Sequence, residues 1–321
     1  MSTRSYAIIG TGAIGGFYGA KLQQLGRDVH FLLNSDYEQV RYQGLSVESP
    51  TGDFRLFPVQ AYNDPQQIPP CDVAIVALKT TQNHLLPQLL PPVIKEDGVV
   101  LILQNGLGIE PQIAEIVNST RVIGGLCFIC SNKVGKGHIR HLDYGMISMG
   151  EYQDRYESGG ITPRMQQIAE DFNNAGIPVE LSENLLLARW KKLVWNIPYN
   201  GLSVVLNAQT DELMNAPESR SLVEEIMREV LRGAKGCHCI IPEDFIQTML
   251  NHTENMKPYL TSMKLDYNSQ RPLELEAIIG NPWRMATERG VDLPLIGMLY
   301  RQLQFLDFKN RLPDFPDHIF S

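Results

Sequence analysis

A glycine-rich turn near the N-terminus places the tightest limit on how this chain can fold. The turn, Gly10 to Gly15, reads GTGAIG and follows a short apolar stretch, Tyr6 to Ile9. A helical stretch comes next and is stopped by Gly26, and Asp28 to Leu33 supplies a second strand. G-x-G-x-x-G within a strand-turn-helix-strand unit of about thirty residues is typical of a dinucleotide-binding βαβ unit.

Each glycine of this turn has a physical role. Gly10 permits a tight turn, Gly12 lets the backbone approach a pyrophosphate, and Gly15 allows the helix to pack closely on the strand. The helix N-terminus then offers N–H groups to the phosphates. The predicted cofactor-binding residues of the turn are Gly10, Thr11, Gly12, Ala13, Ile14 and Gly15.

Two polar side chains follow later strands of the predicted sheet. Asp72 to Leu78 and Val99 to Leu103 are near-continuous apolar runs, as expected for a parallel sheet covered on both faces. Lys79 follows the first run and Asn105 the second, at the strand ends where ligands bind. A solvated, helix-capping role explains Lys79 equally well, and a turn before glycine explains Asn105.

The remainder of the first half suggests where one domain ends. From Gly124 to Tyr152 we expect short β segments with glycine turns, then a helix from Arg164 to Ala175 and a last strand from Ile177 to Leu181. Ser182 to Asn184 looks like a polar helix cap. The sequence therefore predicts an α/β fold, with an N-terminal Rossmann-type doubly wound sheet in residues 1–182 and an all-α C-terminal domain in residues 183–321.

An unusual row of polar residues lies on the first helix predicted in the second half. Leu185 to Leu206 has helical periodicity, and Lys192, Asn196 and Asn200 are spaced i, i+4 and i+8, so they share one face. Buried amides need hydrogen-bonding partners, which makes this face a poor choice for plain packing. Solvent exposure is the alternative explanation. Pro198 predicts a kink between the two asparagines.

Three further helices are predicted, at Glu218 to Lys235, Pro242 to Met256 and Leu275 to Glu288. Glu274 precedes the third, where an acidic residue favours the helix dipole, so a structural role explains it. The helical half could supply a homodimer interface, and its amphipathic faces could equally pack against each other.

Composition excludes several classes of protein. A net charge of -8 argues against a nucleic-acid surface, and no apolar run approaches the roughly 18 residues of a membrane span. The N-terminus lacks a signal-peptide pattern, which favours a cytoplasmic location. The five cysteines are an odd number and are expected to be reduced and buried, and neither Cys127 with Cys130 nor Cys237 with Cys239 supplies a metal-ligand set. We expect a small-molecule partner and no metal.

An ordered set of motifs resembles one known family, the ketopantoate reductases (2-dehydropantoate 2-reductases). The motifs after the glycine turn are VALK ending at Lys79, QNG around Asn105, WKKLVWN at 190–196, Asn200, Ser262-Met263, and RPLELEAIIG at 271–280. The resemblance implies NAD(P)H-dependent reduction of 2-dehydropantoate to pantoate, as in pantothenate and coenzyme A biosynthesis. It implies NADP as the cofactor, with NAD as the alternative.

The resemblance also implies roles for the polar residues. Lys192 becomes the general acid, and Glu274 holds the distal hydroxyl of the substrate. Asn196 and Asn200 become substrate-contacting residues, and Ser262 helps to bind the substrate carboxylate. Lys79 and Asn105 match residues that lie between cofactor and substrate.

The chain also departs from the family. Members that prefer NADPH carry an arginine where this chain has Asn34, which can donate a hydrogen bond to a 2′-phosphate but cannot neutralise it. Asp36 lies two residues further on, and an asparagine that some members use is absent near Thr210. One alternative is therefore another small 2-keto or hydroxy acid as substrate. A second is a non-catalytic NAD(P)-binding sensor, although such a protein would not need Lys192 and Glu274.

Overall fold

The computed structural model describes residues 4–258 and 260–312, and the chain divides into two compact units. The first comprises residues 1–105 and 109–188, and the second residues 106–108 and 189–321. The border predicted at 182/183 lies just before helix α6 (Leu185–Val205), whereas this division falls within that helix. None of the helices among the described residues is both long and apolar enough to cross a membrane.

The first unit is built on a mixed sheet that has ten strands within the described residues. In sheet order they are β4 (Phe54–Leu56), β3 (Leu45–Glu48), β9 (His138–Glu151), β8 (Val122–Gly135), β7 (Ile94–Ile102), β6 (Cys71–Val76), β1 (Ser5–Ile9), β2 (Asp28–Leu32) and β5 (Gln60–Tyr62), with β10 (Val179–Ser182) paired to β9. The strands from β5 to β8 are parallel, and the β8–β9 and β3–β4 pairs are antiparallel.

Strand β1 lies at the centre of the parallel part. Ile8 pairs with Phe31 of β2 on one side and with Ile75 of β6 on the other. Ala7 and Ile9, which point to the opposite face from Ile8, are also buried, so both faces of the strand are covered. Because the chain passes from β1 to β2 and later returns to β6 on the far side, the strand order reverses at the carboxyl end of β1. The predicted Rossmann-type sheet is confirmed.

Helices α1 and α5 pack against each other on one face of this sheet. Phe17 of α1 and Phe172 of α5 belong to the same hydrophobic core as Ile8. The α-helices of this unit are α1 (Ala13–Gln24), α2 (Tyr37–Gln43), α3 (Leu86–Leu89), α4 (Glu110–Val117) and α5 (Pro163–Asn174). The short 3-10 helices are η1 (Pro65–Gln67), η2 (Thr80–Leu85), η3 (Pro91–Val93), η4 (Ser119–Arg121) and η5 (Asp154–Tyr156).

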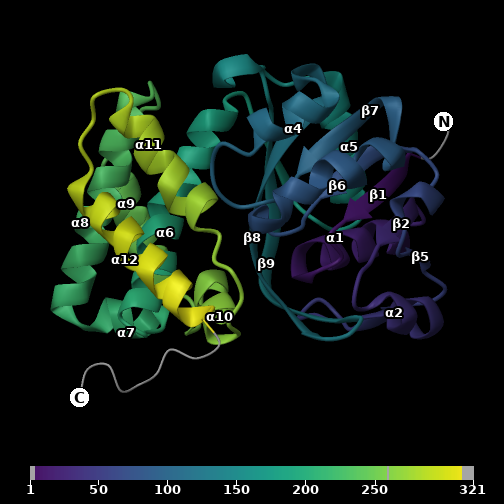
Figure 1. Ribbon diagram of the computed structural model, residues 1–321, viewed down its shortest axis with the longest axis horizontal. Helices are drawn as coiled ribbons and strands as arrows, with labels where there is room; N and C mark the ends of the chain where they lie inside the picture. Colours follow the sequence, from purple (N-terminus) through teal and green to yellow (C-terminus); the bar gives the residue numbers. More distant parts are fainter. Residues whose placement is uncertain (1–3, 259, 313–321) are drawn as a thin grey trace. The chain divides into compact units, whose positions relative to one another are not determined.

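The segment predicted as short β pieces between residues 124 and 152 forms two long strands instead. β8 and β9 each run for 14 residues, and Figure 1 shows them as a pair of long neighbouring strands. The glycines that suggested turns lie inside the strands, where other groups approach closely. A Cβ at Gly125 would lie 2.6 Å from the Leu103 side chain, and one at Gly124 would lie 2.5 Å from Leu185. These glycines serve close packing rather than chain reversal.

The second unit is helical, as predicted, and α8 packs against four other helices of it: α7, α9, α11 and α12 (Figure 1). Besides α6, its helices are α7 (Thr210–Asn215), α8 (Pro217–Gly236), α9 (Asp244–Glu254), α10 (Ser262–Asn268), η6 (Glu276–Gly280), α11 (Asn281–Thr287) and α12 (Pro294–Asn310). Helix α6 continues through Pro198 without interruption, and the kink expected there stays a prediction.

The predicted α-helix from Leu275 to Glu288 is wrong in its first half. Residues Glu276–Gly280 form a π-helix, and the α-helical geometry begins only at Asn281. Ala277, Ile278 and Ile279 are buried in succession, so the apolar pattern gave no sign of the wider turn. A π-helical turn inside a helix is rare and is frequently found at a functional site.

All five cysteines are buried, and no disulfide joins them. Burial raises the pKa of Cys71 to about 12 and the pKa values of Cys130 and Cys239 to about 11. These thiols therefore stay protonated near neutral pH, as expected for packing residues.

Candidate functional site

Two glycines of the turn after β1 are required by the packing of the first unit. Gly10 has a φ of 98°, and a Cβ there would lie 2.3 Å from the backbone nitrogen of Leu78. A Cβ at Gly15 would lie 2.3 Å from the carbonyl oxygen of Gly10. The turn, the start of α1 and the loop after β6 are thus in direct contact, and side chains larger than hydrogen have no room at either position.

Gly12 differs, because its surroundings are open. Apart from its chain neighbours, no described atom lies within 4 Å of a Cβ built there, and Gly12, the N-cap of α1, has no side chain to cap the helix that starts at the next residue. Thr11 closes the turn by donating its hydroxyl proton to the Leu32 carbonyl oxygen at 2.9 Å, and Ala13 and Ile14 form the half-buried first turn of α1. Open space over Gly12 beside uncapped N–H groups fits the pyrophosphate of a dinucleotide.

Lys79 and Asn105 follow the ends of adjacent strands, β6 and β7. The loops that carry them are joined by Gln104, whose side-chain nitrogen donates to the Leu78 carbonyl oxygen at 2.8 Å and to Asn83 Oδ1 at 2.7 Å. Lys79 is exposed and Asn105 is half-buried. The structure therefore brings the glycine turn, Lys79 and Asn105 to neighbouring strand ends at one edge of the sheet.

The end of β2 carries Asn34, and its side chain is exposed. Asp36, the acidic residue nearest to it, is only 4% exposed and already bound: its Oδ2 lies 2.6 Å from Lys133 Nζ and accepts a hydrogen bond from Gly137 N at 2.9 Å. Burial opposes ionisation, but these two partners outweigh it and hold the pKa of Asp36 below its usual value. Asp36 thus anchors the β8–β9 turn. No local pattern predicts its pairing with Lys133, which lies far along the chain.

The predicted polar row is real and mostly buried. Asn196 is 6% and Asn200 3% exposed, and Lys192 is half-buried, so the alternative of plain solvent exposure is wrong for both asparagines. Asn200 Oδ1 accepts a long hydrogen bond, 3.4 Å, from Met263 N, which places Asn200 beside Ser262. The Asn196 amide forms no hydrogen bond with any described residue. An amide that is nearly buried and unbonded is suited to meet a ligand.

Glu274 lies immediately before the π-helix and is 6% exposed. Its carbonyl oxygen accepts a hydrogen bond from Ile278 N at 3.1 Å. The preceding residue is fixed too, because Leu273 N donates to Asp307 Oδ1 at 3.0 Å. Burying a carboxylate costs free energy, and a favourable interaction with the helix dipole alone does not explain why Glu274 is buried here.

The candidate residues therefore form two groups, one in each unit. The glycine turn, Asn34, Lys79 and Asn105 belong to the first unit, and Lys192, Asn196, Asn200, Ser262 and Glu274 to the second. Within the second, sequence reasoning overlooked Ser203 on α6, Asn207 just after it, and Lys264 on α10, which bonds to Asn207. The i+3 spacing of Ser203 from Asn200 was the signal that could have revealed Ser203, and no local pattern marks the other two.

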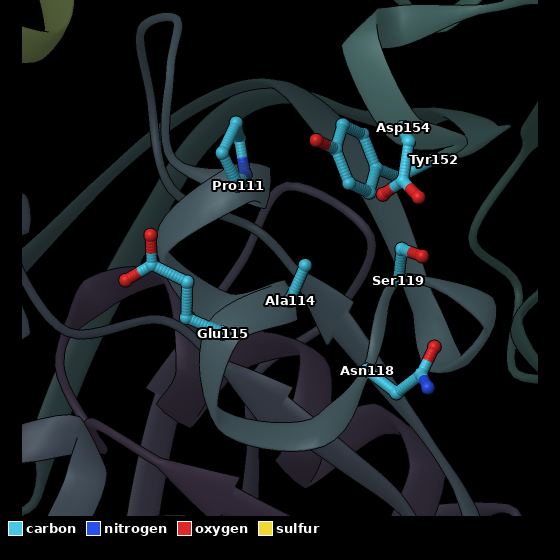
Figure 2. Close-up of a pocket in the computed structure, with 7 residues that line it drawn as sticks. All are labelled: Pro111, Ala114, Glu115, Asn118, Ser119, Tyr152 and Asp154. Atoms are coloured by element: carbon cyan, nitrogen blue, oxygen red, sulfur yellow. The ribbon is translucent and has the colours of Figure 1, made fainter.

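A hollow of about 450 Å³ lies elsewhere on the first unit, between α4 and the residues that follow β9 (Figure 2). Figure 2 shows the Asp154 carboxylate near the Tyr152 ring and the Glu115 carboxylate well apart from both. None of the candidate residues lines this hollow.

Family models match both units of the chain. The model described as "Ketopantoate reductase PanE/ApbA" matches residues 6–154, and "Ketopantoate reductase PanE/ApbA C terminal" matches residues 184–307. The chain belongs to the ketopantoate reductase family. The matched ranges include every candidate residue, from Gly10 to Glu274.

Individual proteins of the ketopantoate reductase family, and solved structures with the same fold, are similar to this chain over nearly its whole length. A 2-dehydropantoate 2-reductase from Nostoc sp. is 65% identical over 97% of this chain and 98% of its own. The crystal structure of 2-dehydropantoate 2-reductase from Geobacter metallireducens is 40% identical, with a TM-score of 0.90 over 94% of this chain and 99% of its own. D-Mandelate dehydrogenase with NADH and anilino(oxo)acetate is 21% identical, with a TM-score of 0.85 over 96% of this chain and 100% of its own, and shares the fold.

Proposed function

We propose that this chain reduces 2-dehydropantoate to pantoate with NADPH. The observation that carries the proposal is the 65% identity, over 97% of the chain, to the 2-dehydropantoate 2-reductase of Nostoc sp.. The buried polar row on α6 supports it, because a keto acid with a distal hydroxyl needs several polar partners and one proton donor. A non-catalytic sensor would need only the glycine turn.

Lys192 is the proposed general acid. Its ammonium can polarise the carbonyl oxygen of the substrate by a charge-assisted hydrogen bond and then donate its proton to that oxygen as negative charge develops there. A bound reduced nicotinamide supplies the hydride that reaches the carbonyl carbon. The half-buried position of Lys192 on the rigid helix α6 favours a fixed direction for proton transfer.

The other polar residues of the second unit hold the substrate in this proposal. Ser262 and Asn200, which the Met263 bond sets side by side, bind its carboxylate end. Glu274 accepts a hydrogen bond from the distal hydroxyl, and Asn196 offers its unbonded amide to the reacting part of the molecule. Removing water from these groups strengthens each contact.

The residues of the first unit fit a dinucleotide. Gly10 to Gly15 would receive the pyrophosphate, Asn34 the 2′-phosphate region, and Lys79 and Asn105 the end nearest the substrate. With Asp36 bound to Lys133, the ribose lacks the acidic partner that usually selects NAD, which favours NADP. The missing arginine at position 34 limits that preference.

One experiment tests reaction, cofactor and substrate together. The purified protein is mixed with NADPH or NADH and with ketopantoate or a panel of other 2-keto acids, and cofactor oxidation is followed by absorbance. We expect the fastest rate with NADPH and ketopantoate. A higher kcat/KM for another keto acid would overturn the substrate, and tight cofactor binding without turnover of any keto acid would favour the sensor.

The homodimer and the cytoplasmic location remain predictions. Exposed Phe305 and Phe308 on α12 support an interface in the helical unit, since large apolar side chains rarely face solvent together without a partner. Sedimentation velocity tests the dimer, and a single monomeric species at micromolar concentration would contradict it.

A further inference from the structure

The polar row of α6 continues past Asn200, the last residue of the row to which the family resemblance gives a role. Ser203, fully buried, is three residues after Asn200 on the same face of α6, and Asn207 follows just beyond the end of the helix. Both face the first turn of α10. The segment from 200 to 207 therefore contributes a second polar stretch, directed at another helix.

Three contacts join these residues to α10. Asn200 Oδ1 accepts from Met263 N, and the hydroxyls of Ser203 and Thr261 lie 2.8 Å apart. At the far end, Lys264 Nζ donates to Asn207 Oδ1 at 2.6 Å. The contacts fall on both sides of Ser262, at the residue before it and the two after it. We call these three contacts the α6–α10 seam.

Lys264 is the least expected member of the seam. Its side chain is only 3% exposed, its Nζ lies 5.0 Å from the centre of the Tyr267 ring, and it forms no ion pair with any described carboxylate. Burial lowers the pKa of Lys264. A methionine or leucine would fill the same space without the cost of removing an ammonium from water. The amine therefore needs an explanation other than packing.

We propose that Lys264 is a positioning residue that fixes Ser262 relative to Asn200 through its bond to Asn207. Helix α10 has seven residues, too few to be stable alone, and the Thr261 hydroxyl caps its first turn by accepting from Lys264 N at 3.2 Å, so the placement of this turn along α6 depends on contacts with neighbouring residues. Lys264 supplies the contact farthest from Asn200 and thereby sets how α10 is oriented along α6. This role rests on the proposed function, in which Ser262 and Asn200 bind the carboxylate end of the keto acid.

Two variants break the same bond from opposite sides. Lys264→Met removes the ammonium and keeps the volume. Asn207→Gly removes the amide and suits the backbone, because Asn207 has a φ of 53° that glycine adopts without strain. Each is expected to raise KM for ketopantoate about tenfold, as for loss of one hydrogen bond to a charged group. The double variant should match either single one.

The kcat and the Kd for NADPH of the same variants distinguish a positioning role from simple destabilisation of the protein. We expect kcat to change less than about twofold and the Kd for NADPH not at all, since neither residue lies in the first unit. Asn207→Asp keeps the acceptor oxygen and should retain the original KM. Lys191→Met, at an exposed position of α6, is the matched lysine control.

The outcomes distinguish this proposal from the function it rests on. Active wild-type protein with unchanged KM in Lys264→Met and Asn207→Gly overturns the positioning role, whatever the variants do to Tm. A wild-type protein that does not turn over ketopantoate overturns the proposed function, and this role with it. If Lys264→Met does not fold, Asn207→Gly and Asn207→Asp decide the question.

Discussion

The glycine turn after β1 and the polar row of α6 are both prepared for polar ligands, but by different means. The turn offers backbone N–H groups, and its key positions are defined by the absence of side chains at Gly10, Gly12 and Gly15. The row on α6 offers side chains, among them the buried amides of Asn196 and Asn200. One surface is fixed by the course of the chain, and the other by the choice of residues along a regular helix.

This difference has a consequence for stability. Because the space over Gly12 is open, water can bond to the N–H groups of the turn when no ligand is present, whereas burying an amide costs free energy until it finds a partner. Asn196 is 6% exposed and forms no hydrogen bond with any described residue, so it carries part of this cost in the absence of a ligand. We therefore expect that removing a polar ligand-binding group raises the free energy of unfolding in the helical unit but not in the sheet unit. Five measurements test this contrast.

The largest expected effect is the loss of the proposed proton donor. Lys192→Ala should lower kcat about 10²-fold to 10⁴-fold, the usual contribution of a general acid, while the Kd for NADPH stays close to its original value. Steady-state rates and fluorescence titration measure the two quantities. Lys191→Ala, at the exposed neighbouring position, should leave both unchanged. Appreciable turnover by Lys192→Ala would assign the proton to another group.

The glycine turn should respond differently at two nearby positions. At Gly12, alanine meets no described atom, so Gly12→Ala should fold normally but weaken NADPH binding about 10-fold to 100-fold by occupying the phosphate space. At Gly10, alanine would overlap the Leu78 backbone at a positive φ, so Gly10→Ala should lower the free energy of unfolding by about 3 kcal/mol. Thermal unfolding with cofactor titration separates them, and equal losses of Tm would contradict the distinction.

Asn196→Leu tests the trade-off on α6. Leucine removes an amide that has no partner in the described structure, so the ligand-free protein should gain about 1 kcal/mol of stability. The same change should raise KM for ketopantoate about tenfold. Asn200→Leu is the matched comparison, because it breaks the bond to Met263 N and should lower Tm. A lower Tm for Asn196→Leu would show that its amide stabilises the protein without a ligand.

Asp36 gives the sheet unit a dependence on pH. Its pKa in the folded protein lies below its usual value, so the carboxylate stabilises the fold above the unfolded pKa of about 3.9, and that contribution is lost as pH falls through the folded pKa. Asp36→Asn should cost about 2 kcal/mol near neutral pH and progressively less below about pH 4. Urea unfolding at several pH values measures the difference. Asp292→Asn, at an exposed position, should show none.

The smallest expected effect is on the choice of cofactor. Asn34→Arg adds a charge at the exposed end of β2 and should raise the ratio of kcat/KM for NADPH over NADH about tenfold. Asn34→Asp should lower the same ratio, since a carboxylate repels the 2′-phosphate. If neither variant changes the ratio, the 2′-phosphate does not approach position 34.

The parts of the molecule that were predicted well are those that a short stretch of sequence determines. The strand expected at Tyr6 to Ile9 is found at Ser5–Ile9, and the spacing of Lys192, Asn196 and Asn200 on one helix sufficed to suggest a shared face. Family resemblance, rather than periodicity, was needed to single out Glu274, because a residue before a helix has an ordinary structural explanation.

The parts that the sequence did not predict depend on distant partners. Strand β3 pairs with β9, and Asp36 pairs with Lys133, in each case across a long stretch of chain that no local pattern describes. The π-helix was not predicted because its buried residues follow the same apolar pattern as an α-helix. The burial of Lys264 was not predicted because a lysine in a helix is normally solvated, and only the position of Asn207 shows why this one is buried.

Residues 106–108 belong with the helical unit although residues 109–188 of the first unit separate them from the rest of it. Leu107 N donates to the Ala277 carbonyl oxygen at 2.8 Å, and the Leu107 carbonyl oxygen accepts from Asn281 Nδ2 at 2.7 Å, across a sequence separation of 174 residues. At the usual rates of translation, of about 5–20 residues per second, these partners are synthesised roughly 10–35 s after Leu107. The loop that carries Asn105 is therefore among the last parts of the protein to acquire its final anchor, well after the sheet around it can form.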